Sequence, residues 1–137
     1  MSGGPDLRDF ETRCQVRWGD MDSMAHLNNT VYLRFMEEAR LCWFRACGML
    51  DPAAPTGPIL ARVECDFRKP VVWPADIVVR QRITRVGRSS VDHELELFLD
   101  RPDGELVAEG KSVLVWMNYA SGKSEPWPDA IRALISV

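Results

Sequence analysis

Hydrophobic residues recur at helical spacing between residue 29 and about residue 50. The face that they form contains Tyr32, Leu33, Phe35, Met36, Ala39, Leu41, Trp43, Phe44, Ala46, Cys47 and Leu50. Side chains three and four positions apart lie on one side of an α-helix, and so wide a face predicts a helix that is enclosed on most sides. Gly48 and the prolines at 52 and 55 should end this helix.

The hydrophobic pattern changes to a period of two after these prolines. Alternation predicts strands at 58–68, 76–86, 90–99 and 105–117, after a first strand at 11–18. Arg101-Pro-Asp-Gly104 predicts a turn, and a short helix should follow Pro126 and Pro128. We therefore expect one α+β domain over residues 1–137, with a five-stranded antiparallel sheet wrapped around one long central helix. Both strand faces are partly apolar, which predicts an oligomer.

Composition and charge exclude several classes of protein. The chain has 137 residues, of which 46% are hydrophobic and 27% charged, and its net charge is −3. Nucleic-acid binders show a basic excess, so we expect no nucleic-acid partner. No apolar run reaches the roughly 20 residues that cross a membrane, and the first residues lack a signal-peptide core, so we expect a cytoplasmic protein with no membrane partner. The four cysteines form no Cys-x-x-Cys pair, which predicts free thiols.

Several kinds of catalytic site are also missing from the sequence. There is no Gly-x-Ser-x-Gly, Walker A or Gly-x-Gly-x-x-Gly motif, so a serine triad or a nucleotide cofactor is disfavoured. His26 and His93 are the only histidines and lack the spacing of metal ligands, so we expect no metal site. His93 falls on the apolar face of a predicted strand, where we expect a structural histidine with satisfied hydrogen bonds.

The chemistry concentrates in a polar segment before the helix, residues 18–29, which we call the hinge. It contains Asp20, Asp22, His26, Asn28 and Asn29. A helix N-terminus offers unpaired N–H groups to a developing oxyanion, and a nearby carboxylate can act as general base or nucleophile. The alternative is that the aspartates cap a turn and the asparagines cap the helix.

The hinge resembles a known family. The run from Asp20 to Asn29, followed by Tyr32 and Phe35-Met-Glu-Glu-Ala-Arg40, is similar to the hotdog-fold acyl-CoA thioesterases of the 4-hydroxybenzoyl-CoA thioesterase type. Weaker similarity continues through 65–70, 86–90, 104–110 and the C-terminal prolines.

The resemblance implies roles for parts of this chain. It makes Asp22 the catalytic carboxylate and directs the amides near Asn28 and Asn29 at the thioester carbonyl. It also implies paired subunits with each active site at their interface, and a loop at 87–90 near the coenzyme A arm. Ala25 stands where the family usually has glycine, which matters if that position needs a positive φ.

The residues and the resemblance together predict an acyl-CoA thioesterase. Its catalytic residues are expected to be Asp22, His26 and Asn29, and its substrate-binding residues Asn28, Tyr32, Arg88, Ser89 and Ser90. No cofactor is needed beyond the coenzyme A of the substrate. The expected partners are an acyl-CoA or an acyl carrier protein, and further copies of the chain in a homodimer or homotetramer.

Alternatives stay open at this point. Glu37 is a second candidate carboxylate, although Arg34 and Arg40 lie within ion-pair reach on the same helix. His26 could instead serve a hotdog dehydratase or acyl-transfer enzyme, and the chain could be a non-catalytic module that binds acyl thioesters. Arg68, Lys69 and Arg85 could bind phosphates or could be ordinary charges at strand ends, whereas the Gly-Arg-Ser-Ser context of Arg88 favours phosphate contact.

Overall fold

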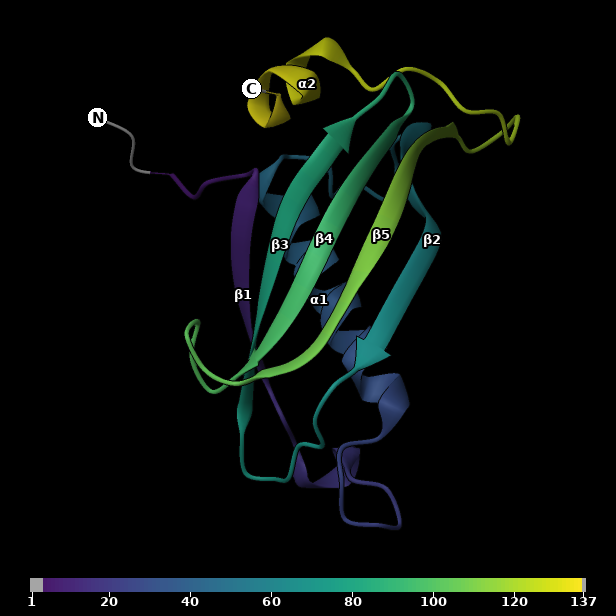
Figure 1. The fold of residues 1–137 in the computed structure, drawn as a ribbon. Coiled ribbons are helices and arrows are strands. Elements are labelled where there is room, and N and C mark those ends of the chain that lie inside the picture. Colours follow the sequence, from purple (N-terminus) through teal and green to yellow (C-terminus); the bar gives the residue numbers. More distant parts are fainter. Residues whose placement is uncertain (1–3, 137) are drawn as a thin grey trace.

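A computed structural model describes residues 4–136 and contains a five-stranded antiparallel sheet with two α-helices (Figure 1). The expectation of no signal-peptide core therefore rests partly on residues outside the described range. The elements are, in chain order, β1 (Asp9–Gln15), a 3-10 turn (Trp18–Asp20), α1 (Asn29–Ala46), β2 (Thr56–Phe67), β3 (Asp76–Val86), β4 (Ser90–Leu99), β5 (Leu106–Asn118) and α2 (Asp129–Ile135). The predicted order of strands and helices is confirmed, and so is the five-stranded antiparallel sheet.

The helical part differs from the expectation of one long helix. α1 has 18 residues and α2 has seven. α1 ends at Ala46 rather than near residue 50 because Gly48 adopts a φ of 75°. The Met49 N–H then donates to the Phe44 carbonyl at 2.8 Å, which closes the helix end. Leu33 and Leu41 on α1 are 39% and 43% exposed, so the prediction of a helix enclosed on most sides is wrong for a single chain.

The strand order β1-β3-β4-β5-β2 puts β1 and β2 at opposite edges of the sheet. α1 joins these two edges by crossing one face of the sheet diagonally, behind the strands in Figure 1. Its contacts include both β1 and β3. Phe35, Met36 and Ala39 of α1 meet buried side chains of β3 and β4 such as Val79 and Leu97. Burying each large apolar side chain contributes about 1.5–3 kcal/mol, so this contact fixes the helix on the sheet.

His93 is buried between the sheet and α1, but its side chain makes no hydrogen bonds within the described residues. Its side chain is 1% exposed, and the Trp43 ring meets it edge-on with 4.7 Å between centroids. Neither ring nitrogen has a hydrogen-bond partner among residues 4–136. Burial, supported by the charge of Arg40, lowers the pKa of His93 to about 3. The prediction of a buried histidine is confirmed, and the prediction that its hydrogen bonds are satisfied is wrong.

Neither described helix is long and apolar enough to cross a membrane. Within the same range, no group of three or more His, Cys, Asp and Glu side chains is arranged to hold a metal ion.

Candidate active site

The hinge forms a tight loop at one end of the sheet, at the bottom of Figure 1. Met21 pairs with Leu27, and the Asp22 N–H donates to the His26 carbonyl at 2.7 Å. The Leu27 N–H donates to the Val71 carbonyl at 2.8 Å, which ties the loop to the segment before β3. Ala25 lies at the tip with a φ of 60°. This left-handed conformation favours glycine, which accounts for the glycine that the family resemblance implies there.

The carboxylate of Asp22 is held by this loop through one oxygen. Its Oδ1 accepts the N–H groups of Met24 at 2.9 Å and His26 at 3.2 Å. Its Oδ2 has no hydrogen-bond partner among residues 4–136, and the side chain is exposed. Asp22 therefore caps the loop and still offers one free oxygen, so the capping role and a chemical role are compatible.

The start of α1 supplies a free donor. Asn28 is the N-cap, and its Oδ1 accepts the Thr30 N–H at 3.0 Å. The Asn28 N–H donates to the Asp20 carbonyl, and the Val31 N–H donates to the Asn28 carbonyl. Within the part of the chain that the structure describes, the Asn29 N–H makes no hydrogen bond. Such an amide at the positive end of a helix dipole can bind an oxyanion.

A cavity of about 240 Å³, which we call the hinge cavity, brings these groups together. Its lining consists of Asp22, His26, Leu27, Asn29, Tyr32, Phe67, Arg68, Lys69 and Pro70. Asp22, His26 and Asn29, the three residues predicted to be catalytic, thus line one cavity. A larger cavity of about 430 Å³ lies over the charged side chains of β2–β5, among them Arg62, Glu94 and Lys111, and contains none of the predicted residues.

Tyr32 lines the cavity, and its hydroxyl makes a hydrogen bond within the protein. The hydroxyl donates to the Lys69 carbonyl at 3.0 Å, and the ring meets Phe67 edge-on at 5.2 Å. Burial raises the pKa of Tyr32. The end of β2 and the residues after it thus form the second wall, which the sequence analysis did not assign to the catalytic site. The weak family similarity at 65–70 and the charges of Arg68 and Lys69 pointed to this segment, but only tertiary contacts join it to α1.

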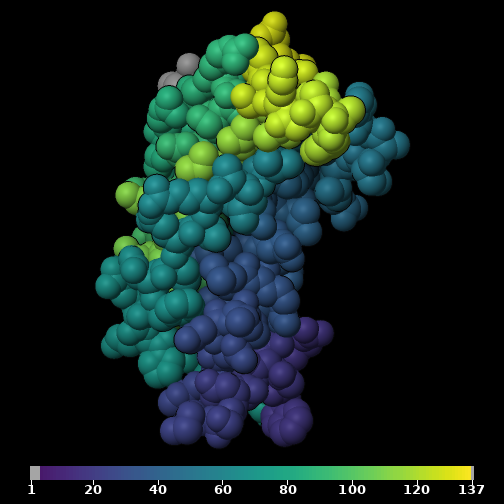
Figure 2. Space-filling model, turned by 90° about the vertical axis from the view of Figure 1, so that its right-hand side faces the viewer, coloured from purple at the N-terminus to yellow at the C-terminus, as the bar shows by residue number. Residues whose placement is uncertain are grey.

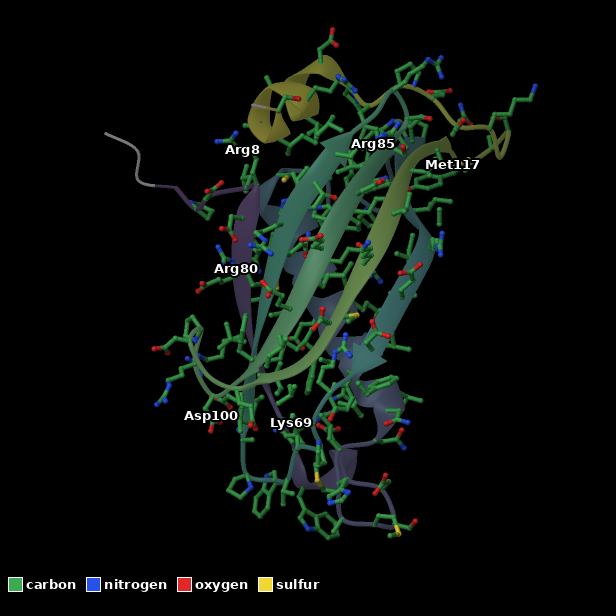
Figure 3. All side chains as sticks on the ribbon, viewed as in Figure 1. Arg8, Lys69, Arg80, Arg85, Asp100 and Met117 are labelled. Atoms are coloured by element: carbon green, nitrogen blue, oxygen red, sulfur yellow. The ribbon has the colours of Figure 1, made fainter. Side chains whose placement is uncertain are left out.

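Arg88 and Ser89 lie in the turn between β3 and β4, and Ser90 begins β4, at the opposite end of the sheet from the hinge. β3 has 11 residues and spans about 33 Å at roughly 3.3 Å per residue, so its length separates this turn from the hinge end of the sheet. Figure 3 shows this separation, with Lys69 near the lower end of the sheet and Arg85 near the upper end. The Ser89 carbonyl accepts the Trp127 Nε1–H at 2.9 Å, so the turn packs against the C-terminal segment. One chain alone does not bring the predicted coenzyme A contacts to the hinge.

Glu37 lies outside the hinge cavity. It lines a separate surface groove of α1 together with Arg34, Leu41 and Arg45.

Similarity to known proteins covers nearly the whole described chain. A family model described as the thioesterase-like superfamily matches residues 16–135. The PA2801 protein of Pseudomonas aeruginosa has a similar structure, with a TM-score of 0.85 and 42% identity over 90% of this chain and 95% of that one. A thioesterase of Thermus thermophilus, solved with coenzyme A and zinc, has a TM-score of 0.75 and 33% identity over 93% and 97%. The chloroplastic acyl-acyl carrier protein thioesterase ATL3 of Arabidopsis thaliana is 28% identical over 124 residues, which are 86% of this chain and 64% of that protein.

Proposed function

The chain belongs to the thioesterase-like superfamily and is an enzyme that hydrolyses thioesters, and from this premise we propose that its substrates are acyl-coenzyme A molecules. One observation carries the proposal. Asp22 and Asn29 line the same cavity, and within residues 4–136 the Asp22 Oδ2 and the Asn29 N–H make no hydrogen bonds. The coenzyme A bound to the Thermus thermophilus relative supports this substrate class.

In the proposed reaction the thioester carbonyl oxygen accepts the Asn29 N–H, which stabilises the negative charge that develops there. Asp22 accepts a proton from water as the water oxygen bonds to the carbonyl carbon. The tetrahedral intermediate then expels the coenzyme A thiolate, which takes up a proton, and the free acid leaves. In the alternative, the Asp22 carboxylate attacks the carbonyl carbon, the C–S bond breaks and the coenzyme A thiolate leaves and takes up a proton. Water then hydrolyses the resulting anhydride, which releases the free acid and restores Asp22. His26 lines the same cavity and either binds the substrate or orients the loop.

No metal and no cofactor other than the coenzyme A of the substrate enters this mechanism.

We further propose that two chains pair through β2 to complete each site. β2 is a 12-residue edge strand paired only with β5, and its Val63 and Phe67 are 37% and 46% exposed. Figure 2 shows α1 in blue reaching the surface of this side, where β2 also lies. β2 also carries the charged residues Arg62, Glu64 and Asp66, but a long edge strand with exposed apolar side chains still favours pairing with a second strand. The paired sheets would wrap around both α1 helices in the hotdog arrangement.

Antiparallel pairing of the two β2 strands about a twofold axis would place the hinge of one protomer near the end of the partner's sheet that lies opposite the partner's own hinge. That end holds the 87–90 turn, with Arg85, Arg88 and Arg132 around it. Within residues 4–136 none of these arginines pairs with a carboxylate. Guanidinium groups bind phosphate oxygens well, so Arg88, Ser89 and Ser90 are proposed to hold the coenzyme A phosphates across the interface.

The first test is free-thiol release from short, long and aromatic acyl-CoAs. We expect wild type to release thiol and Asp22→Asn to be slower by about 10²-fold or more, the scale of a lost general base. Asp103→Asn, in an exposed turn, is the matched control and should keep the wild-type rate. Activity that survives Asp22→Asn would move the chemistry to His26 or Glu37.

A second candidate substrate is an acyl carrier protein thioester, favoured by the match to the Arabidopsis enzyme. The same acyl group presented on coenzyme A and on a carrier protein decides between them by kcat/KM. Binding without thiol release in either form would support the non-catalytic module. Loss of an enoyl-directed activity in His26→Ala, with Asp22→Asn tolerated, would support the dehydratase.

The proposed pairing is tested by sedimentation. We expect Val63→Lys, which places a charge on the apolar edge, to shift the protein to monomer and to lower its activity. Val72→Lys puts the same charge on an exposed valine away from β2 and should leave the mass unchanged. A wild-type monomer would contradict the pairing.

A further inference from the structure

Asp20 is a buried carboxylate with an unusual number of partners. It is 5% exposed, and its Oδ2 accepts the Arg17 N–H at 2.8 Å. The Nη2 of Arg34 lies 3.0 Å from both carboxylate oxygens. The backbone carbonyl of the same residue accepts the Asn28 N–H at 2.9 Å. One residue thus joins the strand end, the helix cap and the second turn of α1.

Arg34 is a suitable partner because α1 fixes its position. It lies five residues after Asn29, and its guanidinium is 5.5 Å from the centroid of the Phe35 ring. Burial is the largest influence on Asp20 and raises its pKa, but the Arg17 N–H and the Arg34 guanidinium outweigh it, so the pKa lies below its ordinary value. The ion pair is therefore formed at neutral pH.

The position of this ion pair relates it to the candidate catalytic groups. Asp20 stands two residues before Asp22, and Arg34 stands on the helix whose first residue is Asn29. The base and the oxyanion donor both belong to the hinge, where the pairing of Met21 with Leu27 and the bonds between Asp22 and His26 close the loop. The Asp20 side chain adds the contact that this loop lacks otherwise, because it joins the start of the loop to the second turn of α1 through Arg34.

We propose that Asp20 and Arg34 are positioning residues for the thioester hydrolysis proposed above, because their ion pair sets the distance between the Asp22 carboxylate and the Asn29 amide. Neither residue lines the hinge cavity, so both act through Asp22 and Asn29 rather than on the substrate. A displacement of about 1 Å between reacting groups lowers a rate by about 10²-fold, so the pair should affect kcat far more than KM.

The kinetic test compares four variants with wild type on one acyl-CoA. Asp20→Asn and Arg34→Met should lower kcat by about 10- to 100-fold with KM within about threefold. Arg34→Lys keeps the charge and should recover part of the rate. Arg45→Met, an exposed arginine of the same helix with no carboxylate partner within residues 4–136, is the matched control and should keep the wild-type kcat.

A double variant separates positioning from general destabilisation. Asp20→Asn combined with Asp22→Asn should be no slower than Asp22→Asn alone, because the pair acts through Asp22. Two results would overturn the proposal and leave only a structural role. One is a loss of kcat in the double variant that equals the product of the two single losses, and the other is a fall in kcat that matches the fall in the folded fraction of the protein.

A measurement without substrate keeps this inference distinct from the proposed function. Amide hydrogen exchange should be at least about tenfold faster at Met24 and His26 in Asp20→Asn, because those amides are held by Asp22, while the interior of α1 stays protected. Unchanged exchange at both amides would overturn the inference whatever the activity. Wild type that releases no thiol from any acyl-CoA would overturn the proposed substrate, and the exchange result would then decide the inference alone.

Discussion

His93 makes the folded protein sensitive to acid in a way that one substitution should remove. The side chain is buried against Trp43 with both ring nitrogens unpartnered among residues 4–136. Its pKa is lowered from 6.5 to about 3, chiefly by burial and further by Arg40. The unfolded chain therefore takes up a proton at His93 near pH 6.5, whereas the native chain resists protonation down to about pH 3. Stability is full above pH 6.5 and falls as the pH drops between these values.

The magnitude follows from the two pKa values. At 1.36 kcal/mol for each unit of pH, the loss of unfolding free energy is about 2 kcal/mol at pH 5 and approaches about 5 kcal/mol near pH 3. Domains are stable by only about 5–15 kcal/mol, so the effect at pH 5 is measurable. His93→Phe keeps a flat ring beside Trp43 and cannot titrate. It also removes two unpartnered polar atoms, each of which costs about 1–3 kcal/mol when buried.

The assay is urea unfolding at pH 7, 6 and 5, followed by tryptophan fluorescence at one protein concentration. Wild type should lose about 2 kcal/mol more than His93→Phe between pH 7 and pH 5. Carboxylates titrate in both proteins, so the difference isolates His93. His26→Gln removes the other, exposed histidine and should retain the wild-type loss. An equal loss in wild type and His93→Phe would refute the reasoning.

Two further predictions concern backbone positions. Ala25→Gly should raise stability by up to about 1 kcal/mol in urea unfolding, because relief of the left-handed alanine outweighs the extra entropy of glycine in the unfolded chain, and a lower urea midpoint would contradict this. Gly110→Ala should cost about 3 kcal/mol, because a Cβ there would lie 2.0 Å from the Glu64 carbonyl oxygen and force β2 away from β5. Gly19→Ala is the control, because a Cβ at Gly19 would have no atom within 4 Å. Equal urea midpoints for the two alanine variants would contradict the predicted clash between β5 and β2.

Local patterns were enough to predict much of the fold. The alternation in β3 and β4 predicted both strands with the bounds that the structure has, Asp76–Val86 and Ser90–Leu99. The apolar face of α1 predicted the helix, and the expectation that Gly48 ends it is confirmed, although Leu50 continues the periodicity past the residue where the chain turns. Period and turn chemistry are properties of neighbouring residues, so a sequence contains them directly.

The candidate site was predictable only in part. The composition of the hinge pointed to Asp22, His26 and Asn29, and the structure places them around one cavity. It also places Arg88 at the far end of the sheet, where it does not reach the hinge of the same chain. The wall at Phe67–Pro70 was indicated only by weak family similarity at 65–70 and by the charges of Arg68 and Lys69. Its contact with Tyr32 could not be predicted, because it joins residues more than 30 positions apart.

The sequence by itself determined the order of strands and helices, the polar loop before α1 and the helix start that can bind an oxyanion. Only the tertiary structure decided that Asp22 keeps one oxygen free, that Asp20 pairs with Arg34, and that His93 is buried without partners among residues 4–136. The physical reason is that periodicity and capping arise between neighbours in the chain. Hydrogen-bond satisfaction, burial and pKa values depend instead on every group that folding brings within a few ångströms.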